Sequence, residues 1–230
     1  MATHVGSTTA GANAATIAPA WPAGTLPADV AYIFWATVNT ATPNVPTGFT
    51  EIAANDQANG SLRTRIYRKV LTATESGSIT LSNSTALANR QAACLCVWRG
   101  LNTTTPEDSS PSWRNETVSG TTHANPAETT TVADCVIITA IMERTSSITS
   151  NWTPPTGYVE RADTQSLAFG SGGTIAAVAD DLASKAIGTY TPGVWTSNSA
   201  TATPNVGTYT LALRNAPATT PFNGWGLIIG

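Results

Sequence analysis

The stretch VPTGFTEIA at Val45–Ala53 returns in the second half of the chain as PPTGYVERA at Pro154–Ala162. Both copies read Pro-Thr-Gly-aromatic. Proline fixes its own φ and glycine accepts a positive φ, so each copy predicts a tight turn, and the aromatic ring can anchor the strand that follows. We therefore expect a turn that one fold needs twice, with these structural turn residues: Pro46, Gly48, Phe49, Pro155, Gly157 and Tyr158.

Short apolar stretches bounded by Gly, Pro, Asn or Ser surround the first of these turns, which is the pattern of β-strands. In the first half they are Asp29–Val38, Gly48–Ala54, Leu62–Leu71, Ser78–Leu81 and Ala92–Trp98. The stretch Leu62–Leu71 (LRTRIYRKVL) alternates in polarity. This alternation predicts that Leu62, Ile66 and Val70 face the core and that Arg63, Arg65, Tyr67 and Lys69 face water.

The second half repeats the order of these landmarks. LPADVAYIFWATV is echoed by TVADCVIITAIME, so Ala28-Asp29-Val30 corresponds to Ala133-Asp134-Cys135, and the halves close on AACLCVWRGLN and GTYTLALRNA. Several landmarks in one order indicate internal duplication. We predict an all-β fold, a β-sandwich of jelly-roll type, in which the two halves either follow in tandem or share one core.

The boundary between the halves is expected at NTTTPEDSSPS (Asn102–Ser112), where two prolines discourage regular structure. The resulting organisation is a first repeat at 1–103, a linker at 104–112, a second repeat at 113–216 and an apolar tail at 217–230. A free apolar tail favours aggregation unless it packs on something. We therefore predict that it docks on a partner through Phe222, Trp225, Leu227, Ile228 and Ile229.

Composition and charge exclude several classes of partner. Charged residues make up 11% of the chain, against about 25% in an ordinary soluble domain, and the net charge is -3. This balance offers no surface for neutralising phosphates, so we expect no nucleic-acid partner. No apolar run approaches the roughly 18 residues that a membrane span needs, and the N-terminal residues do not form a secretory signal. We expect no membrane partner and synthesis in a cytoplasm without a signal peptide.

The three cysteines lie in apolar runs. Cys94 and Cys96 would share one face of a strand at a distance of about 7 Å, which is too far for a disulfide between them. We expect buried free thiols that act as small hydrophobic side chains. A bridge from Cys94 or Cys96 to Cys135 is the alternative.

Groups for catalysis are few. His4 and His123 are the only histidines, and neither accompanies a Gly-x-Ser-x-Gly motif, so a hydrolytic triad lacks its base. Paired carboxylates could support glycosidase chemistry, and the candidates are Glu160, Asp163, Asp180 and Asp181 in the second half and Glu51 and Asp56 in the first. The repeated acids Asp29 and Asp134 fit turn formers better. We predict no enzyme activity, no catalytic residue, no metal and no cofactor.

Aromatic rings give the alternative function, because exposed rings serve as stacking platforms for sugars. Trp35 and Trp98 lie inside apolar strands and are expected in the core. Trp113, after the linker, and Trp152, in the loop TSNWTPPTG, are the candidate glycan contacts.

The order of landmarks resembles a family of duplicated β-sandwich proteins among the virion structural proteins of tailed bacteriophages. The matching elements are Asp29–Val38, Pro46–Phe49, Tyr67–Lys69 and Arg99-Gly100, although Ala28 and Ala133 replace a glycine and Phe49 and Tyr158 replace a tryptophan. The resemblance implies a capsid decoration, tail or neck accessory protein located in the virion. Its implied partners are other capsid or tail subunits, further copies of itself as a homo-oligomer, and in the alternative a host-surface glycan.

Overall fold

The computed structural model describes residues 1–38, 42–56, 62–85, 88–118, 120–145, 152–167, 172–197 and 205–217, and these ranges contain strands and turns but no helix. The tail residues Phe222, Trp225, Leu227, Ile228 and Ile229 lie outside the described residues. The first half contains β1 (Thr3–Ala14), β2 (Thr16–Ile17), β3 (Val30–Thr37), β4 (Thr50–Asp56), β5 (Arg63–Val70), β6 (Leu81–Ser82) and β7 (Asn89–Arg99). The second half contains β8 (Ser112–Glu116), β9 (Thr122–Ala124), β10 (Glu128–Thr130), β11 (Cys135–Thr145), β12 (Val159–Gln165), β13 (Gly173–Lys185), β14 (Gly188–Tyr190), β15 (Val194–Thr196) and β16 (Asn205–Arg214).

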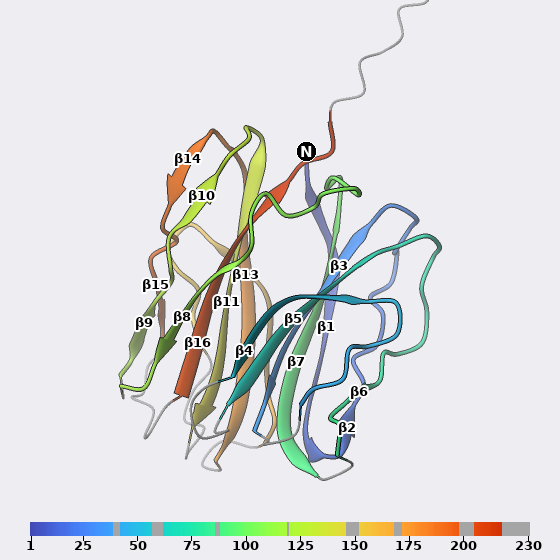
Figure 1. Ribbon diagram of the computed structural model, residues 1–230, viewed down its shortest axis with the longest axis vertical. Coiled ribbons are helices and arrows are strands. Elements are labelled where there is room, and N and C mark those ends of the chain that lie inside the picture. Colours follow the sequence, from blue (N-terminus) through green and yellow to red (C-terminus); the bar gives the residue numbers. More distant parts are fainter. Residues whose placement is uncertain are drawn as a thin grey trace, which may run out of the picture.

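Two antiparallel five-stranded sheets form the body of the protein (Figure 1). The first has the order β1-β7-β3-β5-β4 and the second β12-β13-β11-β16-β8. In each sheet the central strand is the one that follows the Ala-Asp pair, namely β3 or β11. Its neighbours are the last long strand of that half (β7 or β16) and the strand after the Pro-Thr-Gly turn hairpin (β5 or β13).

The inner faces of the two sheets share one apolar core, which gives a β-sandwich-like arrangement. Tyr32, Phe34 and Trp98 enter this core from the first sheet, and Ile138, Met142 and Tyr209 enter it from the second. The central strand β3 is buried along its whole length. Its run of aromatic and aliphatic residues is therefore explained by cover on both faces, as for other central strands.

The edge strands of the two sheets meet on both sides of the sandwich. On one side β1 contacts β12, where Ser7 Oγ donates to the carbonyl of Arg161. On the other side β4 faces β8, and Asn115 Nδ2 donates to Asn55 Oδ1 at 3.0 Å. Each sheet edge is thereby tied to the opposite sheet.

Gly11 marks the closest backbone approach between β1 and β12. A Cβ at this position would lie 2.1 Å from the carbonyl oxygen of Gln165, which is backbone and cannot swing away. We expect Gly11→Ala to lower the free energy of unfolding by about 1–3 kcal/mol because the sheets must separate locally.

Urea denaturation followed by circular dichroism measures this change. Gly120→Ala is the matched control, because a Cβ there meets its nearest neighbour at 3.7 Å, an ordinary contact. Equal stability of the two variants would show that the β1–β12 contact adapts without cost.

The outer faces of both sheets are also covered. Ile17, Phe49 and Leu81 pack over the first sheet, and Trp152 and Trp195 pack over the second. This corrects the expected pattern in β5, because Tyr67 is fully buried in the outer layer and Arg65 is 4% exposed. The inward residues Leu62 and Ile66 do lie in the shared core.

The cysteines are free and buried, as expected for small hydrophobic side chains. Cys94 and Cys96 lie in the shared core, and Cys94 Sγ donates to the carbonyl of Ala176 at 3.2 Å. Burial raises the pKa of the Cys135 thiol to about 11, with a further contribution from Asp108. These thiols are therefore poor nucleophiles at neutral pH.

Candidate functional site

The two Pro-Thr-Gly turns have the same geometry. Gly48 and Gly157 have φ values of 79° and 88°, and Phe49 N and Tyr158 N each donate to the proline carbonyl at the start of their turn at 3.0 Å. This is the pattern of a type II turn, which needs glycine at its third position. Phe49 packs into the outer layer of the first sheet and Tyr158 against that of the second. Both sets of turn residues therefore position strands.

The two tryptophans selected as glycan contacts lie in different environments. Trp113, on the edge strand β8, is 51% exposed. Trp152 is 1% exposed, and its Nε1 donates to Glu143 Oε2 at 2.7 Å beneath the outer layer. The expectation for Trp152 was wrong, because its ring fills the space over the second sheet and has no free face for a sugar.

The chain enters and leaves the sandwich at the same end (Figure 1). Ala2 N donates to Asn215 Oδ1 at 2.6 Å, and Ala216 N donates to the carbonyl of Gly100 at 2.8 Å. The C-terminal tail therefore begins beside the N-terminus, at a position fixed by hydrogen bonds.

A pocket of about 470 Å³ opens at this end, and Ala216 and Pro217 form part of its wall. Its apolar lining includes Leu26, which is 47% exposed, and Leu101. The loop that carries Leu26 includes Ala28 at a φ of 70°, a left-handed conformation that favours glycine. In the second half the residue with a positive φ, 63°, is Asp134, which corresponds to Asp29 and not to Ala28.

An ion pair stiffens one wall of this pocket. Arg99 Nε and Nη2 donate to the two carboxylate oxygens of Asp29, both at 2.8 Å. Asp29 is 1% exposed and also accepts the amide of Leu26 at 2.8 Å. A bidentate pair with a buried carboxylate holds its geometry well, so the pocket is pre-formed on this side.

The segment between the two halves is bound to both sheets. Glu107 accepts hydrogen bonds from Tyr32 and Arg68 of the first sheet. Asp108 N donates to the carbonyl of Ala212 on β16 at 2.9 Å, and Arg214 N donates to the carbonyl of Pro106 at 2.8 Å. Residues 104–111 thus lie outside the strands, yet their backbone hydrogen bonds hold them along the second sheet.

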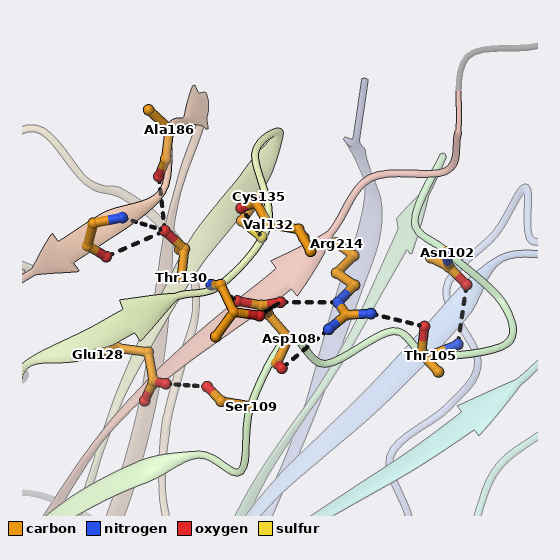
Figure 2. Close-up of polar contacts among 12 residues, drawn as sticks. Asn102, Thr105, Asp108, Ser109, Glu128, Thr130, Val132, Cys135, Ala186 and Arg214 are labelled. Atoms are coloured by element: carbon orange, nitrogen blue, oxygen red, sulfur yellow. Dashed lines mark hydrogen bonds and ion pairs between the residues drawn. The ribbon is translucent and has the colours of Figure 1, made fainter.

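Asp108 is the centre of this connection (Figure 2). Its carboxylate accepts Arg214 Nε at 2.9 Å and Thr131 Oγ1 at 2.9 Å. Burial opposes its ionisation, but the hydrogen bonds from Thr131 and Arg214 outweigh burial and hold the pKa of Asp108 below its ordinary value. Arg214 also reaches Thr105, so it fixes the connection at two points.

The two histidines pack against tryptophan rings in different parts of the protein. His123 is 1% exposed, its Nδ1 is bonded to Glu116, and its ring packs edge-on against Trp152 at 5.0 Å between centroids. His4 packs against Trp98, and burial, followed by Arg161, lowers its pKa. The repeated acids also separate in role, because Asp134 accepts Ser184 Oγ whereas Asp29 pairs with Arg99.

The four candidate carboxylates of the second half, Glu160, Asp163, Asp180 and Asp181, lie on β12 and β13. Asp180 is buried and accepts Trp98 Nε1 and Arg161 Nε, each at 2.8 Å. Asp181 pairs with Lys185. Burial raises the pKa of Asp163 to about 7, with a smaller contribution from Glu160. Within the described ranges no group of three or more His, Cys, Asp or Glu side chains could hold a metal ion.

Sequence reasoning missed the partners of the two arginines that close the halves. Arg99 and Arg214 occupy matching strand ends, but one pairs with Asp29 and the other with Asp108. The repeated arginine was a usable signal. No signal in the sequence indicated that Arg214 pairs with Asp108 and not with Asp134, the counterpart of Asp29, because Asp108 belongs to the connection outside the repeats.

Among the described residues, none forms a helix that could span a membrane. Comparison of the chain with protein-family models, with curated proteins and with solved structures finds no significant match.

Proposed function

We propose that the protein is a non-enzymatic structural component of a bacteriophage virion, a surface or capsid decoration protein or a tail or neck accessory protein. The carrying observation is the position of the tail, because residue 217 lies in the wall of a pre-formed, largely apolar pocket of about 470 Å³. The sequence that follows, ATTPFNGWGLIIG, is apolar. The proposal also rests on the resemblance of the landmark order to duplicated virion proteins.

We infer that the two halves are copies of one β unit. The identical placement of β3 and β11, of β7 and β16 and of β5 and β13 supports duplication, as does the matched geometry of the two turns. The jelly-roll type stays a prediction. A duplicated unit with paired inner faces is equivalent to a fused dimer, and such a rigid block suits repeated assembly.

The tail is proposed to join copies into a homo-oligomer. Four residues separate Pro217 from the first aromatic residue of the tail, Phe222, so the five steps of chain between them reach at most about 18 Å. The apolar part of the tail is therefore tethered to the pocket wall by a short stretch of chain. We propose that it enters the equivalent pocket of a neighbouring copy, where Leu26 and Leu101 receive it.

Truncation of residues 218–230 tests this role. We expect the full chain to form oligomers whose mass depends on concentration, and the truncated chain to be monomeric, by light scattering after size-exclusion chromatography. A second variant, Leu26→Asp, places a charge in the pocket wall and should weaken assembly without removing the tail. Equal masses for the full and truncated chains across concentrations would reject the tail as an assembly element.

Virion localisation needs its own measurement. Mass spectrometry of purified particles should find the full-length protein in them, and particles carrying the truncated chain should contain less of it. Its absence from particles would reject the virion role, including the proposed contacts with capsid or tail subunits.

Carbohydrate or host-receptor binding is the second candidate, favoured by the 51% exposure of Trp113 on the edge strand β8. Exposed aromatic rings at such positions can stack against a sugar. A glycan array should then show binding that Trp113→Ala removes. Binding that persists in Trp113→Ala would exclude this residue as the platform.

A further inference from the structure

A second cavity, of about 340 Å³, opens over the outer face of the first sheet, away from the pocket at the tail. Its walls come from three separate segments: the loop at Trp21, the turn at Phe49 and the stretch from Glu75 to Thr80. The end of β5 contributes Lys69. The volume lies at the lower end of the range for small-molecule sites.

Two aromatic rings and an ion pair form the centre of the cavity. The Trp21 and Phe49 rings are stacked, with centroids 6.1 Å apart and planes 21° apart. Lys69 Nζ lies 5.3 Å from the Trp21 centroid and 5.9 Å from that of Phe49, and it pairs with Glu75 Oε1 at 2.5 Å. The side chains of Lys69 and Glu75 are 21% and 22% exposed, so both remain within reach of a ligand.

Backbone hydrogen bonds hold these walls together. Trp21 N donates to the carbonyl of Gly77 at 2.8 Å, and Ile79 N donates to the carbonyl of Pro19 at 2.9 Å. Glu75 N donates to Thr25 Oγ1 at 3.1 Å, and Thr25 is itself buried. The cavity is therefore ordered before any ligand arrives, which lowers the entropic cost of binding.

The remaining lining is rich in hydroxyl groups, from Thr47, Ser76, Ser78 and Thr80. An ammonium group donates hydrogen bonds, a carboxylate accepts them and a hydroxyl does both. Because Lys69 and Glu75 neutralise each other, an anionic ligand would have to displace Glu75 to pair with Lys69, and a cationic ligand would have to displace Lys69 to pair with Glu75. A neutral ligand that carries many hydroxyl groups and one apolar face leaves this ion pair intact.

We propose that this cavity binds a neutral hexose unit of a glycan. The C–H face of the sugar packs at the Trp21–Phe49 pair, and its hydroxyl groups exchange hydrogen bonds with Lys69, Glu75 and the surrounding serine and threonine side chains. This site is distinct from Trp113 on β8, and it does not depend on the assembly role of the tail.

The backbone around the cavity repeats in the second half, but the side chains differ. Phe49 has its counterpart in Tyr158, which packs against the outer layer that contains Trp152 and Trp195. The bond from Trp21 N to the carbonyl of Gly77 has its counterpart in the bond from Asn125 N to the carbonyl of Gly193, so an asparagine takes the place of the tryptophan in the second half. A turn shared by both halves has thus gained a binding role in one of them.

Saturation-transfer NMR and calorimetry on the full chain test the proposal, with methyl glucoside, methyl galactoside and methyl mannoside as neutral probes and glucuronate as the charged analogue. We expect at least one neutral probe to bind at about 10 mM or below, within the range of weak specific affinities. Lys69→Met and Trp21→Ala should each weaken binding about tenfold or more. Trp113→Ala is the matched control and should leave the affinity unchanged.

Circular dichroism checks that each variant folds, and Ser78→Ala provides a milder variant that should weaken binding if Trp21→Ala does not fold. Failure of every neutral probe to bind would overturn the proposal. So would tighter binding of glucuronate than of glucoside, or binding that Lys69→Met leaves intact and Trp113→Ala removes. None of these outcomes alters the tail-dependent assembly, which is measured separately by mass.

Discussion

Replacing Trp98 with alanine should lower the free energy of unfolding by about 4.5–8 kcal/mol. Trp98 is fully buried in the shared core, and its ring packs edge-on against Tyr32 at 5.9 Å between centroids. Removing a buried tryptophan side chain costs about 3–5 kcal/mol. The loss of the hydrogen bond from Nε1 to the buried carboxylate of Asp180 adds about 1.5–3 kcal/mol. The sum approaches the whole stability of an ordinary domain, which is about 5–15 kcal/mol.

Two further variants separate the contributions. Trp98→Phe keeps most of the ring but loses the hydrogen bond, so it should cost about 2 kcal/mol. Trp113→Ala removes a half-exposed tryptophan and should cost well under 1 kcal/mol, as surface substitutions usually do. Urea denaturation followed by far-ultraviolet circular dichroism measures these costs, because each substitution removes a tryptophan and so changes the intrinsic fluorescence. A cost below about 2 kcal/mol for Trp98→Ala would contradict a core that depends on both sheets.

Local chemistry made the turns predictable. Pro46 and Gly48 and their counterparts Pro155 and Gly157 set the backbone through their own side chains, or through the lack of one. The predicted all-β class followed from the spacing of such turns. The structure has the antiparallel sheets that this class requires. Information of this kind lies within a few residues, so a single sequence contains it.

The outer layers could not be read from the same pattern. Alternation in β5 separates two faces but does not say whether the second face meets water. Tyr67 is buried there because β2, β6 and their flanking loops return over the first sheet. Trp152 is buried for the same reason on the second sheet, with Glu143 accepting its Nε1. The composition of its loop predicted that Trp152 is exposed, but its ring packs over the outer face of the second sheet.

Long-range polar partners were also beyond the sequence. Asp108 and Arg214 are separated by 106 residues, and the proline-rich context of Asp108 favoured a loose linker. The cavity at Trp21, Phe49, Lys69 and Glu75–Thr80 likewise joins four segments that no short motif connects. Such juxtapositions depend on the packing of loops over a sheet, which tolerates many sequences.

Replacing Asp163 with asparagine should stabilise the protein at neutral and alkaline pH. Burial, with a smaller contribution from Glu160, raises the pKa of Asp163 in the folded protein to about 7. An aspartate in the unfolded chain has a pKa near 3.9. As the pH rises from about 4 to 7, the unfolded state releases this proton first, so ionisation favours unfolding and the free energy of unfolding falls. Above about pH 7 both states are ionised and the loss is complete.

The asparagine variant lacks this loss. We expect Asp163→Asn to exceed the wild-type protein in stability by about 2–4 kcal/mol at pH 8 and to match it near pH 4. Urea denaturation at a series of pH values measures the difference, in which the other titrating groups largely cancel. Asp134→Asn removes a charge of the same sign from an exposed loop position and is the control for the loss of one negative charge. A stability difference for Asp163→Asn that does not grow between pH 4 and 8 would show that this carboxyl ionises as freely in the folded protein as in the unfolded chain.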